Sequence, residues 1–411
     1  MNMAATHARG KIAVDKIFGA GAKAQQAINR LGREQVVNGT QGVLLSDQGQ
    51  LVCLPTVEKV LRNLPTAEMI AYAPIRGLPD FLADVVASTF GEYRPDAYIQ
   101  AVATAGGAGA LHHSIWNYSE IGDTVLTTDW FWTPYRVLCQ EALRRLDTFP
   151  LFDDKLQFNL QAFADQAARV LAGQDSLLVI FNTPAHNPTG YSLSAQDWEG
   201  VLAVCRQHEA RGKRITLLLD AAYLDFAGST DSKRLFKQFE KLPAGILTIV
   251  AVSMSKSFTV YGQRVGAMIG ISSDKEVMEE FVNINEYTSR ATWSNINRGA
   301  MQTLTAIYRD PGLAASLESE RDEFVGLIRQ RAQIFIQEAA AVQLGMLPYI
   351  AGFFLSLPTS QPDAVCDKLA AENIYLVPLE KGVRIAVCAI PTAKMPGLAA
   401  AVKRAFTAVG E

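Results

Sequence analysis

The strongest constraint on the fold is a regular alternation along residues 98–270. Short runs of β-branched and aliphatic residues alternate there with longer amphipathic segments, a pattern typical of an α/β layer built on a mainly parallel sheet. The candidate strands are IQAVAT, TVLTT, SLLVIF, ITLLL, LTIVAV and VGAMIGI. Candidate helices cover residues 78–90 and 194–211, and the second opens with Ser194, whose hydroxyl can cap a first turn.

The rest of the chain predicts a second, smaller α/β unit, since 411 residues are too many for one ordinary core. After about residue 310 come a charged helix (317–341), GFFLSL, a helix near 363–372, IYLVP and VRIAVC. We expect the first residues to fold onto this unit, which gives a small domain of residues 1–65 and 311–411 and a large domain of residues 66–310. A ligand site is expected between the two domains.

Composition and charge exclude several classes of protein. The net charge is −3, and acidic and basic residues are mixed along the chain, so nothing predicts binding to nucleic acid or to an anionic membrane. No apolar stretch is long enough to span a bilayer, and the N-terminus lacks the apolar core of an export signal. The five cysteines form no CxxC pair and are odd in number, which predicts neither disulfides nor a metal site and favours a cytoplasmic protein.

Lys256 lies just past the carboxyl end of the LTIVAV run, where open α/β sheets bind their ligands. Arg264 follows eight residues later between two glycines. Its planar fork suits a phosphate, and the glycines let the backbone approach a ligand closely. Ser253 and Ser255 alternate with the lysine and can add hydroxyl donors. A solvated lysine on a loop would explain SxSK alone, but it does not explain the Gly-x-Arg-x-Gly extension.

Asp220 ends the ITLLL run, and Tyr223 follows one turn later. A carboxylate at this point can pair with a protonated pyridine nitrogen, which makes pyridoxal 5′-phosphate (PLP) an effective electron sink. The phenol of Tyr223 can then bond the 3′-oxygen of the ring. A plain helix cap is the alternative interpretation of Asp220.

Two further turns follow apolar runs. FNTPAHNPTG predicts a rigid, irregular loop, in which the amide of Asn187 can bond the same 3′-oxygen; a plain turn is the alternative. ATAGGAGALHH predicts a strand, a turn of small residues and a helix start. The backbone N–H groups of Gly107 and Ala108 can hold a phosphate there, although tight packing of helix on sheet would also explain the glycines.

In order and spacing these segments resemble the fold type I, class I aminotransferases, the family of the aspartate and aromatic amino acid aminotransferases. The family's Asn-Pro-x-Gly loop is HNPTG here, its Asp-x-x-Tyr runs from Asp220 to Tyr223, and its Ser-x-Ser-Lys-x7-Arg-x-Gly runs from Ser253 to Gly266. The resemblance implies a large domain with a mainly parallel seven-stranded sheet and a smaller α/β domain from the N- and C-terminal segments. It also implies PLP bound to Lys256 as a Schiff base, and an active homodimer.

The resemblance assigns further residues to the cofactor and the substrate. Tyr72, in YAPIRG, corresponds to a tyrosine that reaches the cofactor phosphate of the neighbouring subunit. Trp130 corresponds to the tryptophan that stacks on the pyridine ring, although Trp132 leaves the register open and core packing is the alternative for both. Arg384, in GVRIAVC, corresponds to the arginine that binds the substrate α-carboxylate, and Gly42 to a glycine near that group.

Arg290, in SRATWSN, resembles the arginine that dicarboxylate-using members extend across the dimer to the distal carboxylate. Here the family's Asn-Pro-Pro continuation is Asn-Ile-Asn, and a solvated helix arginine is the alternative. The turn GGA replaces the Ser-Gly-Thr common in aspartate aminotransferases, which leaves the phosphate there to backbone amides. These two departures leave the subfamily open.

The predicted reaction is a transamination from aspartate or an aromatic L-amino acid to a 2-oxo acid, which the resemblance implies to be 2-oxoglutarate. Lys256 acts first as carrier and then as general base, with Asp220 and Tyr223 as catalytic partners. This role requires the pKa of the Lys256 amine to fall below the ordinary value of roughly 10.4. A PLP lyase or decarboxylase on the same fold is the alternative, and a ligand-sensing protein without catalysis is a more distant one.

Overall fold

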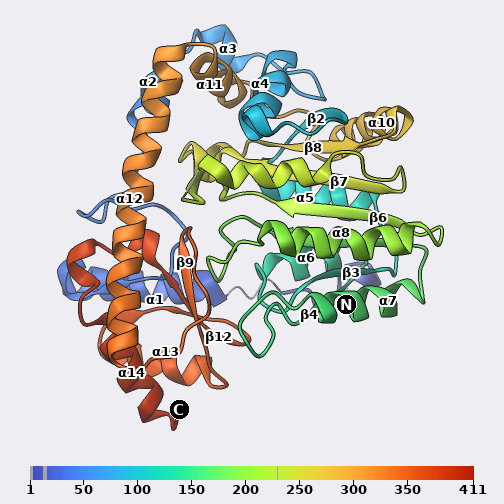
Figure 1. The fold of residues 1–411 in the computed structure, drawn as a ribbon. Helices are drawn as coiled ribbons and strands as arrows, with labels where there is room; N and C mark the ends of the chain where they lie inside the picture. Colours follow the sequence, from blue (N-terminus) through green and yellow to red (C-terminus); the bar gives the residue numbers. More distant parts are fainter. Residues whose placement is uncertain (1–2, 13–15, 229) are drawn as a thin grey trace.

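A seven-stranded sheet forms the largest layer of the protein, for which a computed structural model describes residues 3–12, 16–228 and 230–411 (Figure 1). The strand order is β2-β8-β7-β6-β5-β3-β4. β8 is antiparallel to both of its neighbours, whereas the other neighbouring pairs are parallel. The strands are β2 (Tyr98–Thr104), β3 (Thr124–Thr128), β4 (Arg145–Phe149), β5 (Ser176–Asn182), β6 (Arg214–Asp220), β7 (Ile246–Ser253) and β8 (Gly266–Ser272). The predicted α/β class and mainly parallel sheet are confirmed.

β4 is the one strand of this sheet that has no counterpart among the six apolar runs. It lies at the edge of the sheet beside β3, and its sequence RLDTF is mostly polar. An edge strand has one neighbour instead of two and keeps partial contact with solvent, so it does not need a continuous apolar run.

Alternate residues of the central strands feed two separate cores, one on each face of the sheet. Leu177, Val179 and Phe181 of β5 belong to one apolar cluster, whereas Leu178 and Ile180 belong to the other. This is the period of two expected for a strand that is covered on both faces. The first cluster includes side chains of α7 (Leu160–Leu171) and α8 (Ala195–Glu209), and the second includes those of α5 (Gly106–Asn117) and α6 (Pro134–Glu141).

Local capping residues set where two of the helices begin, and the first of them was predicted from the sequence. Ser194 and Asp197 form a reciprocal capping box at the start of α8. The long helix α12 (Pro311–Ala341) begins six residues before the predicted start, because the carboxylate of Asp310 accepts hydrogen bonds from the next turn and Pro311 suits a first helical position. Further helices between residues 55 and 308 are α2 (Pro55–Arg62), α3 (Thr66–Ile70), α4 (Pro79–Phe90), α9 (Met254–Ser257), α10 (Lys275–Thr292) and α11 (Arg298–Tyr308).

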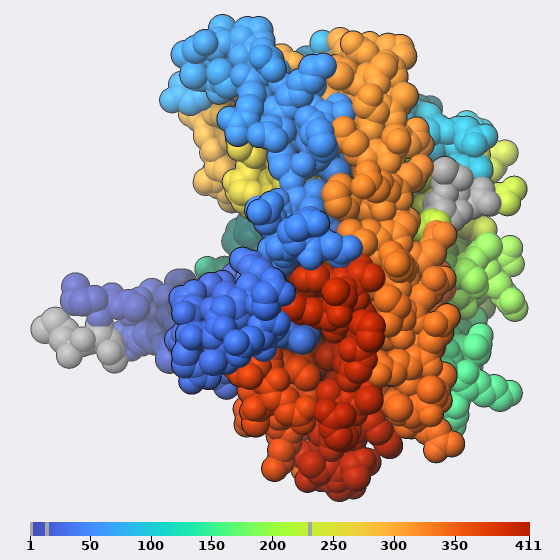
Figure 2. All heavy atoms as spheres, turned by 90° about the vertical axis from the view of Figure 1, so that its left-hand side faces the viewer, coloured from blue at the N-terminus to red at the C-terminus, as the bar shows by residue number. Residues whose placement is uncertain are grey.

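The N- and C-terminal parts of the chain pack together beside the sheet, and Figure 2 shows them side by side along α12. β1 (Val37–Asn38) pairs with β10 (Ile374–Tyr375), and β11 (Val377–Pro378), β12 (Gly382–Ala386) and β9 (Phe354–Pro358) form a three-stranded sheet. The helices of this part are α1 (Lys16–Leu31), α13 (Pro362–Ala371) and α14 (Leu398–Ala408). The domain boundaries at residues 65 and 310 stay predictions.

Short 3-10 helices complete the chain: η1 (Thr6–Ala8), η2 (Arg33–Gln35), η3 (Gly91–Tyr93), η4 (Leu224–Phe226), η5 (Thr230–Phe239), η6 (Tyr261–Gln263), η7 (Val387–Ala389) and η8 (Thr392–Lys394). Across the residues that the structure describes, none of the helices combines the length and the apolar character that crossing a membrane requires.

Candidate active site

Three neighbouring parallel strands end in polar residues at one edge of the sheet. Asn182 at the end of β5 lies opposite Asp220 at the end of β6, and Asp220 lies opposite Ala251, two residues before the end of β7 at Ser253. Parallel strands bring their carboxyl ends to the same edge, which is where such sheets bind ligands. The residues predicted from three separate segments are therefore assembled at this edge.

Lys256 extends from the short helix α9, directly after β7. Its Nζ donates to the carbonyl oxygen of Gly42 at 2.5 Å and lies 4.8 Å from the ring centre of Tyr261 and 5.7 Å from that of Tyr223. Burial lowers the pKa of the amine to about 8, and the nearby Arg384 guanidinium acts in the same direction. About a tenth of the amine is therefore neutral at pH 7, a few hundred times more than for a lysine at its ordinary pKa of roughly 10.4, and a base or nucleophile must be neutral.

Asp220 is buried, and both of its carboxylate oxygens accept hydrogen bonds. Oδ2 accepts from the hydroxyl of Tyr135 at 2.6 Å, and Oδ1 accepts from the backbone N–H of Ala222 at 3.3 Å. Burial raises the pKa of the carboxyl, while the bond from Tyr135 and the nearby Lys256 oppose the rise. A cationic ligand group beside the carboxylate would favour the ionised form further.

Asn182 connects Asp220 to the following loop. Its Nδ2 donates to the backbone carbonyl of Asp220 at 2.9 Å, and its Oδ1 accepts from the backbone N–H of Asn187 at 2.5 Å. Asn187 itself is buried. Neither Asn182 nor Tyr135 was predicted as a site residue, because their contacts depend on how the loop and α6 pack; the Asn directly after the SLLVIF run was the only available signal.

Arg384 lies on β12 and is 2% exposed. Its Nη2 donates to the carbonyl of Thr40 at 2.9 Å, its Nη1 donates to Oδ1 of Asn187 at 3.3 Å, and its guanidinium lies 4.3 Å from the ring centre of Phe354. A buried guanidinium is costly unless its donors are satisfied. In this place it offers a planar pair of donors to an anion bound beside Asn187.

The side chains of Lys256, Arg384, Asn187 and Tyr223 share one cavity of about 900 Å³, together with Gly42. Its charged lining residues within the described chain are all cations, since Arg33 and Lys394 are the others. Apolar side chains of α1, among them Ile17, Phe18 and Ile28, complete the lining. The cavity therefore suits an anion that carries some apolar surface.

A second polar cradle lies at the start of α5, beside Arg264. A Cβ atom built on Gly106 would lie 2.8 Å from Nη2 of Arg264, so the guanidinium sits directly against this turn. Arg264 also donates to Oγ of Ser255 at 3.0 Å. The first turn of α5, which contains Gly107 and Ala108, has no side-chain cap and no acidic residue. Free N–H groups, an arginine and a serine hydroxyl fit a phosphate group.

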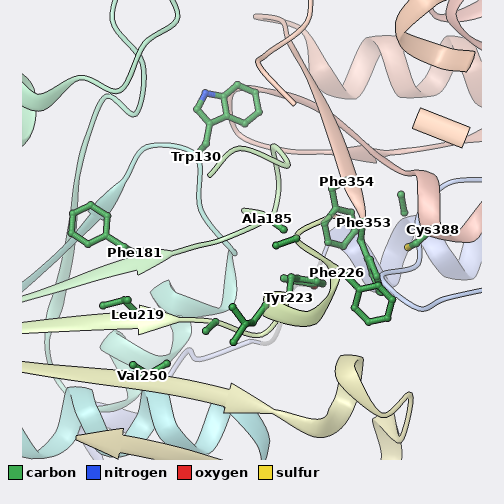
Figure 3. Packing of buried hydrophobic residues seen from close by; sticks show 14 of the residues in the cluster. Trp130, Phe181, Ala185, Leu219, Tyr223, Phe226, Val250, Phe353, Phe354 and Cys388 are labelled. Carbon is green, nitrogen blue, oxygen red and sulfur yellow. The ribbon is translucent and has the colours of Figure 1, made fainter. Parts of the chain in front are cut away.

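Trp132, rather than Trp130, lines the cavity that contains Lys256. The ring of Trp132 meets that of Tyr135 edge-on at 5.6 Å, and Tyr135 holds Asp220. Trp130 is 7% exposed and packs against Gly382 of β12, where an added Cβ would lie 2.7 Å from its ring. In Figure 3 Trp130 lies apart from Tyr223, Phe353, Phe354 and Cys388. Of the two tryptophans that the sequence left open, the structure places Trp132 at the cavity, and the identity of the stacking residue stays a prediction.

Tyr72 and Arg290 are not among the residues that line this cavity within the described chain. Tyr72 follows α3 and is 87% exposed. Arg290 lies in the last turn of α10, is exposed, and donates from Nη1 to Oγ of Ser294 at 2.6 Å. Both were predicted to serve a neighbouring subunit, and that prediction stays open.

Comparison with known proteins identifies the fold and the chemistry. The family described as aminotransferase class I and II matches residues 34–402. The chain belongs to this family. A crystal structure of an aminotransferase from Anaerococcus prevotii DSM 20548 is 36% identical and covers 99% of both chains, with a TM-score of 0.96. The aromatic-amino-acid aminotransferase of Escherichia coli K12 is 26% identical over 393 residues, 92% of this aminotransferase and 94% of that protein.

A further solved structure bears on the cofactor. The aromatic-amino-acid aminotransferase of Burkholderia pseudomallei, covalently bound to pyridoxal phosphate, is 25% identical, with a TM-score of 0.79 over 98% of this aminotransferase and 100% of that chain. The aminotransferase is thus a PLP-dependent transaminase that acts on an amino acid and a 2-oxo acid. The predicted enzyme class and cofactor are confirmed, and the lyase alternative is not supported.

Proposed function

We propose that this aminotransferase moves the amino group of an acidic or aromatic L-amino acid to 2-oxoglutarate, with Lys256 as the residue that carries PLP. The observation that carries the proposal is the shared cavity of Lys256, Asn187, Tyr223 and Arg384. The phosphate cradle at Arg264 and the buried carboxylate of Asp220 fit the two polar ends of the cofactor. The relatives named above include proteins described as aromatic-amino-acid aminotransferases.

PLP supplies the chemistry that side chains lack, because its protonated ring withdraws electrons from the bonds of the substrate α-carbon. In the proposal Asp220 holds the proton on the ring nitrogen, and Tyr223 and Asn187 donate to the 3′-oxygen. Arg384 binds the α-carboxylate with its planar pair of donors. Lys256, with a pKa of about 8, would take the α-proton as general base and return it as general acid to the C4′ carbon of the cofactor.

The stacking residue in this proposal is Trp132, because it lines the cavity beside Lys256. Gly107, Ala108, Ser253, Ser255 and Arg264 are the proposed phosphate ligands. The cations and the apolar side chains of α1 in the cavity lining support both acidic and aromatic donors.

We also propose an active homodimer in which Tyr72 reaches the phosphate, and Arg290 the distal carboxylate, in the site of the second subunit. The proposal is supported by the exposure of three large side chains in the single chain, since Ile70, Tyr72 and Tyr287 are 77%, 87% and 79% exposed. Contact with a second subunit would remove the apolar surface of these side chains from water, which is favourable. A cytoplasmic location is supported by the cysteines, which are free thiols.

Half-reactions test the proposal directly. Purified enzyme loaded with PLP is mixed with single amino acids, and the absorbance change from the PLP to the pyridoxamine form is followed without a 2-oxo acid. We expect conversion with aspartate, glutamate, phenylalanine or tyrosine, and reversal on addition of 2-oxoglutarate. Lys256→Ala is the control, and conversion at an undiminished rate in that variant would refute the role of Lys256.

A further inference from the structure

Arg321 is a buried cation that lies outside the cavity but close to the lysine. It lies on the inward stripe of α12, which also carries Leu317, Ile328 and Ala332, and its side chain is only 9% exposed. An arginine on the apolar stripe of a helix is costly unless partners compensate for its burial. Two of the partners of Arg321 lie directly beside residues of the active site, one near Lys256 and one near Tyr223.

One set of contacts reaches the loop of Lys256. Nε of Arg321 donates to the backbone carbonyl of Ser257 at 2.7 Å, and the guanidinium lies 4.8 Å from the ring centre of Phe258. These are the two residues that follow Lys256. The helix α9 ends at Ser257 after four residues, so its last carbonyls lack a next turn and need partners from elsewhere.

A second set of contacts reaches the segment that follows Tyr223 and the last residue of α11. Nη2 of Arg321 lies 3.7 Å from Oδ2 of Asp225, and Nη1 donates to the hydroxyl of Tyr308 at 3.3 Å. Asp225 lies in η4, which begins directly after Tyr223. On its other oxygen Asp225 faces Lys233 at 4.0 Å. The single guanidinium thus spans the neighbours of Lys256 and the neighbours of Tyr223.

Close packing does not by itself fix this part of the site. A small cavity of about 30 Å³ lies behind α9, lined by Met254, Ser257, Phe258, Asp225 and Tyr308 among others. Side chains beside a void lose contacts on that side. The hydrogen bond from Arg321 to the Ser257 carbonyl therefore contributes more to holding α9 in place, and the Asp225 carboxylate, at 3.7 Å from Nη2, balances the charge of the guanidinium without a hydrogen bond.

We propose that Arg321 is a positioning residue for the reaction, which fixes Lys256 relative to Tyr223 by joining the Ser257 carbonyl to Asp225. The inference rests on the roles of Lys256 and Tyr223 in the proposed function. Arg321 itself touches neither the substrate nor the cofactor, since it does not line the cavity of Lys256 in the described chain. Its effect is expected on the chemical step and not on substrate binding at Arg384.

The test compares two buried arginines of similar exposure. Arg321→Met removes the bridge, while Arg144→Met removes a buried arginine that is bonded to Ser119 and to the carbonyl of Trp116, away from the lysine loop. Both full-length variants are loaded with PLP for measurements of kcat and KM. The apoproteins are also mixed with PLP at a series of pH values, and the midpoint of the capture rate reports the pKa of the amine.

We expect Arg321→Met to lower kcat by about 10- to 100-fold, since misplacing a reacting group by about 1 Å has effects of this size. KM for the amino donor should change by less than about threefold, because the carboxylate site is untouched. The capture midpoint should move up from about 8 toward the ordinary value, as loosening of α9 admits water to Lys256. Arg144→Met should lower thermal stability alone.

Equal effects of the two substitutions on kcat, with an unmoved capture midpoint, would show that Arg321 is merely structural and overturn the inference. A kcat within about twofold of wild type in Arg321→Met would do the same. If the Met variants do not fold, Arg321→Lys and Arg144→Lys carry the same comparison, because lysine keeps the charge but lacks the fork that spans both acceptors. Failure of the wild-type enzyme to capture PLP at Lys256 would instead overturn the proposed function, and the inference with it.

Discussion

The two ends of the active site are held in different ways. At the cofactor end, Asn182 and Asp220 end adjacent strands, and the Asn182 side chain bonds to the backbones of Asp220 and Asn187. The carboxylate of Asp220 accepts from Tyr135. At the substrate end, Arg384 joins segments that lie far apart in the sequence, with the carbonyl of Thr40 on one side and Asn187 on the other.

This difference implies that the cofactor end determines the chemistry and that the substrate end determines the choice of substrate. We call the carboxyl edge of the sheet with Asp220, Asn182 and Asn187 the floor of the site. It is rigid and can hold one cofactor in one orientation. We call the opposite side of the site, which is built from α1, β12 and the predicted second subunit, its wall. The wall can differ between members of a family while the floor stays the same. Substitutions in the floor should therefore affect every substrate, and substitutions in the wall should affect substrates unequally.

The largest effect is expected for Asp220→Ala in the floor. Loss of the carboxylate removes the charge that keeps the ring nitrogen of PLP protonated, and we expect kcat to fall on the order of 10²–10³-fold for every amino donor. Steady-state kinetics with aspartate and phenylalanine provide the measurement, with Tyr135→Phe as a milder control that removes one bond to the carboxylate. Turnover of Asp220→Ala within a few fold of wild type would leave Asp220 as a structural cap.

Next come the two arginines of the wall. Arg384→Ala should lower kcat/KM for acidic and aromatic donors alike, by roughly 10²-fold or more, because all amino acids present the same α-carboxylate. Arg290→Ala should reduce kcat/KM for aspartate by a similar factor but leave phenylalanine nearly unchanged. Equal losses for both donors in Arg290→Ala would remove it from substrate selection.

Substitution of the two tryptophans should affect different properties, namely activity for Trp132 and stability for Trp130. Trp132→Ala is expected to lower kcat/KM by about tenfold, since stacked aromatic rings contribute about 0.5–1.5 kcal/mol beyond burial. Trp130→Ala should mainly lower the free energy of unfolding, by about 3–5 kcal/mol, because its ring fills the space over Gly382. Denaturant titration and kinetics of both variants distinguish the roles, and the opposite pattern would restore Trp130 as the stacking residue.

The smallest effect concerns pH. A lysine with a lowered pKa gains its neutral form as pH rises through the folded value, here about 8. Capture of PLP by the apoprotein should then accelerate roughly tenfold from pH 7 to pH 9 and level off above it. A rate that climbs steadily to pH 10 or beyond would mean that Lys256 is not desolvated.

Residues that directly follow apolar strands could be predicted from the sequence. Lys256, Asp220 and Asn187 each lie a few residues past such a run, and parallel strands bring their carboxyl ends together without any further information. Six strands of the sheet were predicted from their apolar runs, whereas the count of seven came from the family resemblance, because the edge strand β4 is mostly polar.

Contacts that depend on packing could not be predicted. Nothing near Tyr135 or Arg321 in the sequence shows that these side chains meet Asp220 and Ser257, because the partners are 85 and 64 residues away. The choice between Trp130 and Trp132 could not be predicted for the same reason. Trp130 and Trp132 differ by two positions, and only the packing of Trp130 against Gly382 of β12 leaves Trp132 as the ring that lines the cavity.

Covalent labelling tests the central claim most directly. The purified enzyme is reduced with borohydride, digested, and mapped for the peptide that carries the reduced pyridoxyl group. The structure predicts the label on the peptide that contains Lys256, the buried amine in the cavity of Arg384 and Asn187, and no label in Lys256→Ala. Label on a different lysine, or none in the wild-type enzyme, would contradict the assignment of this cavity as the active site.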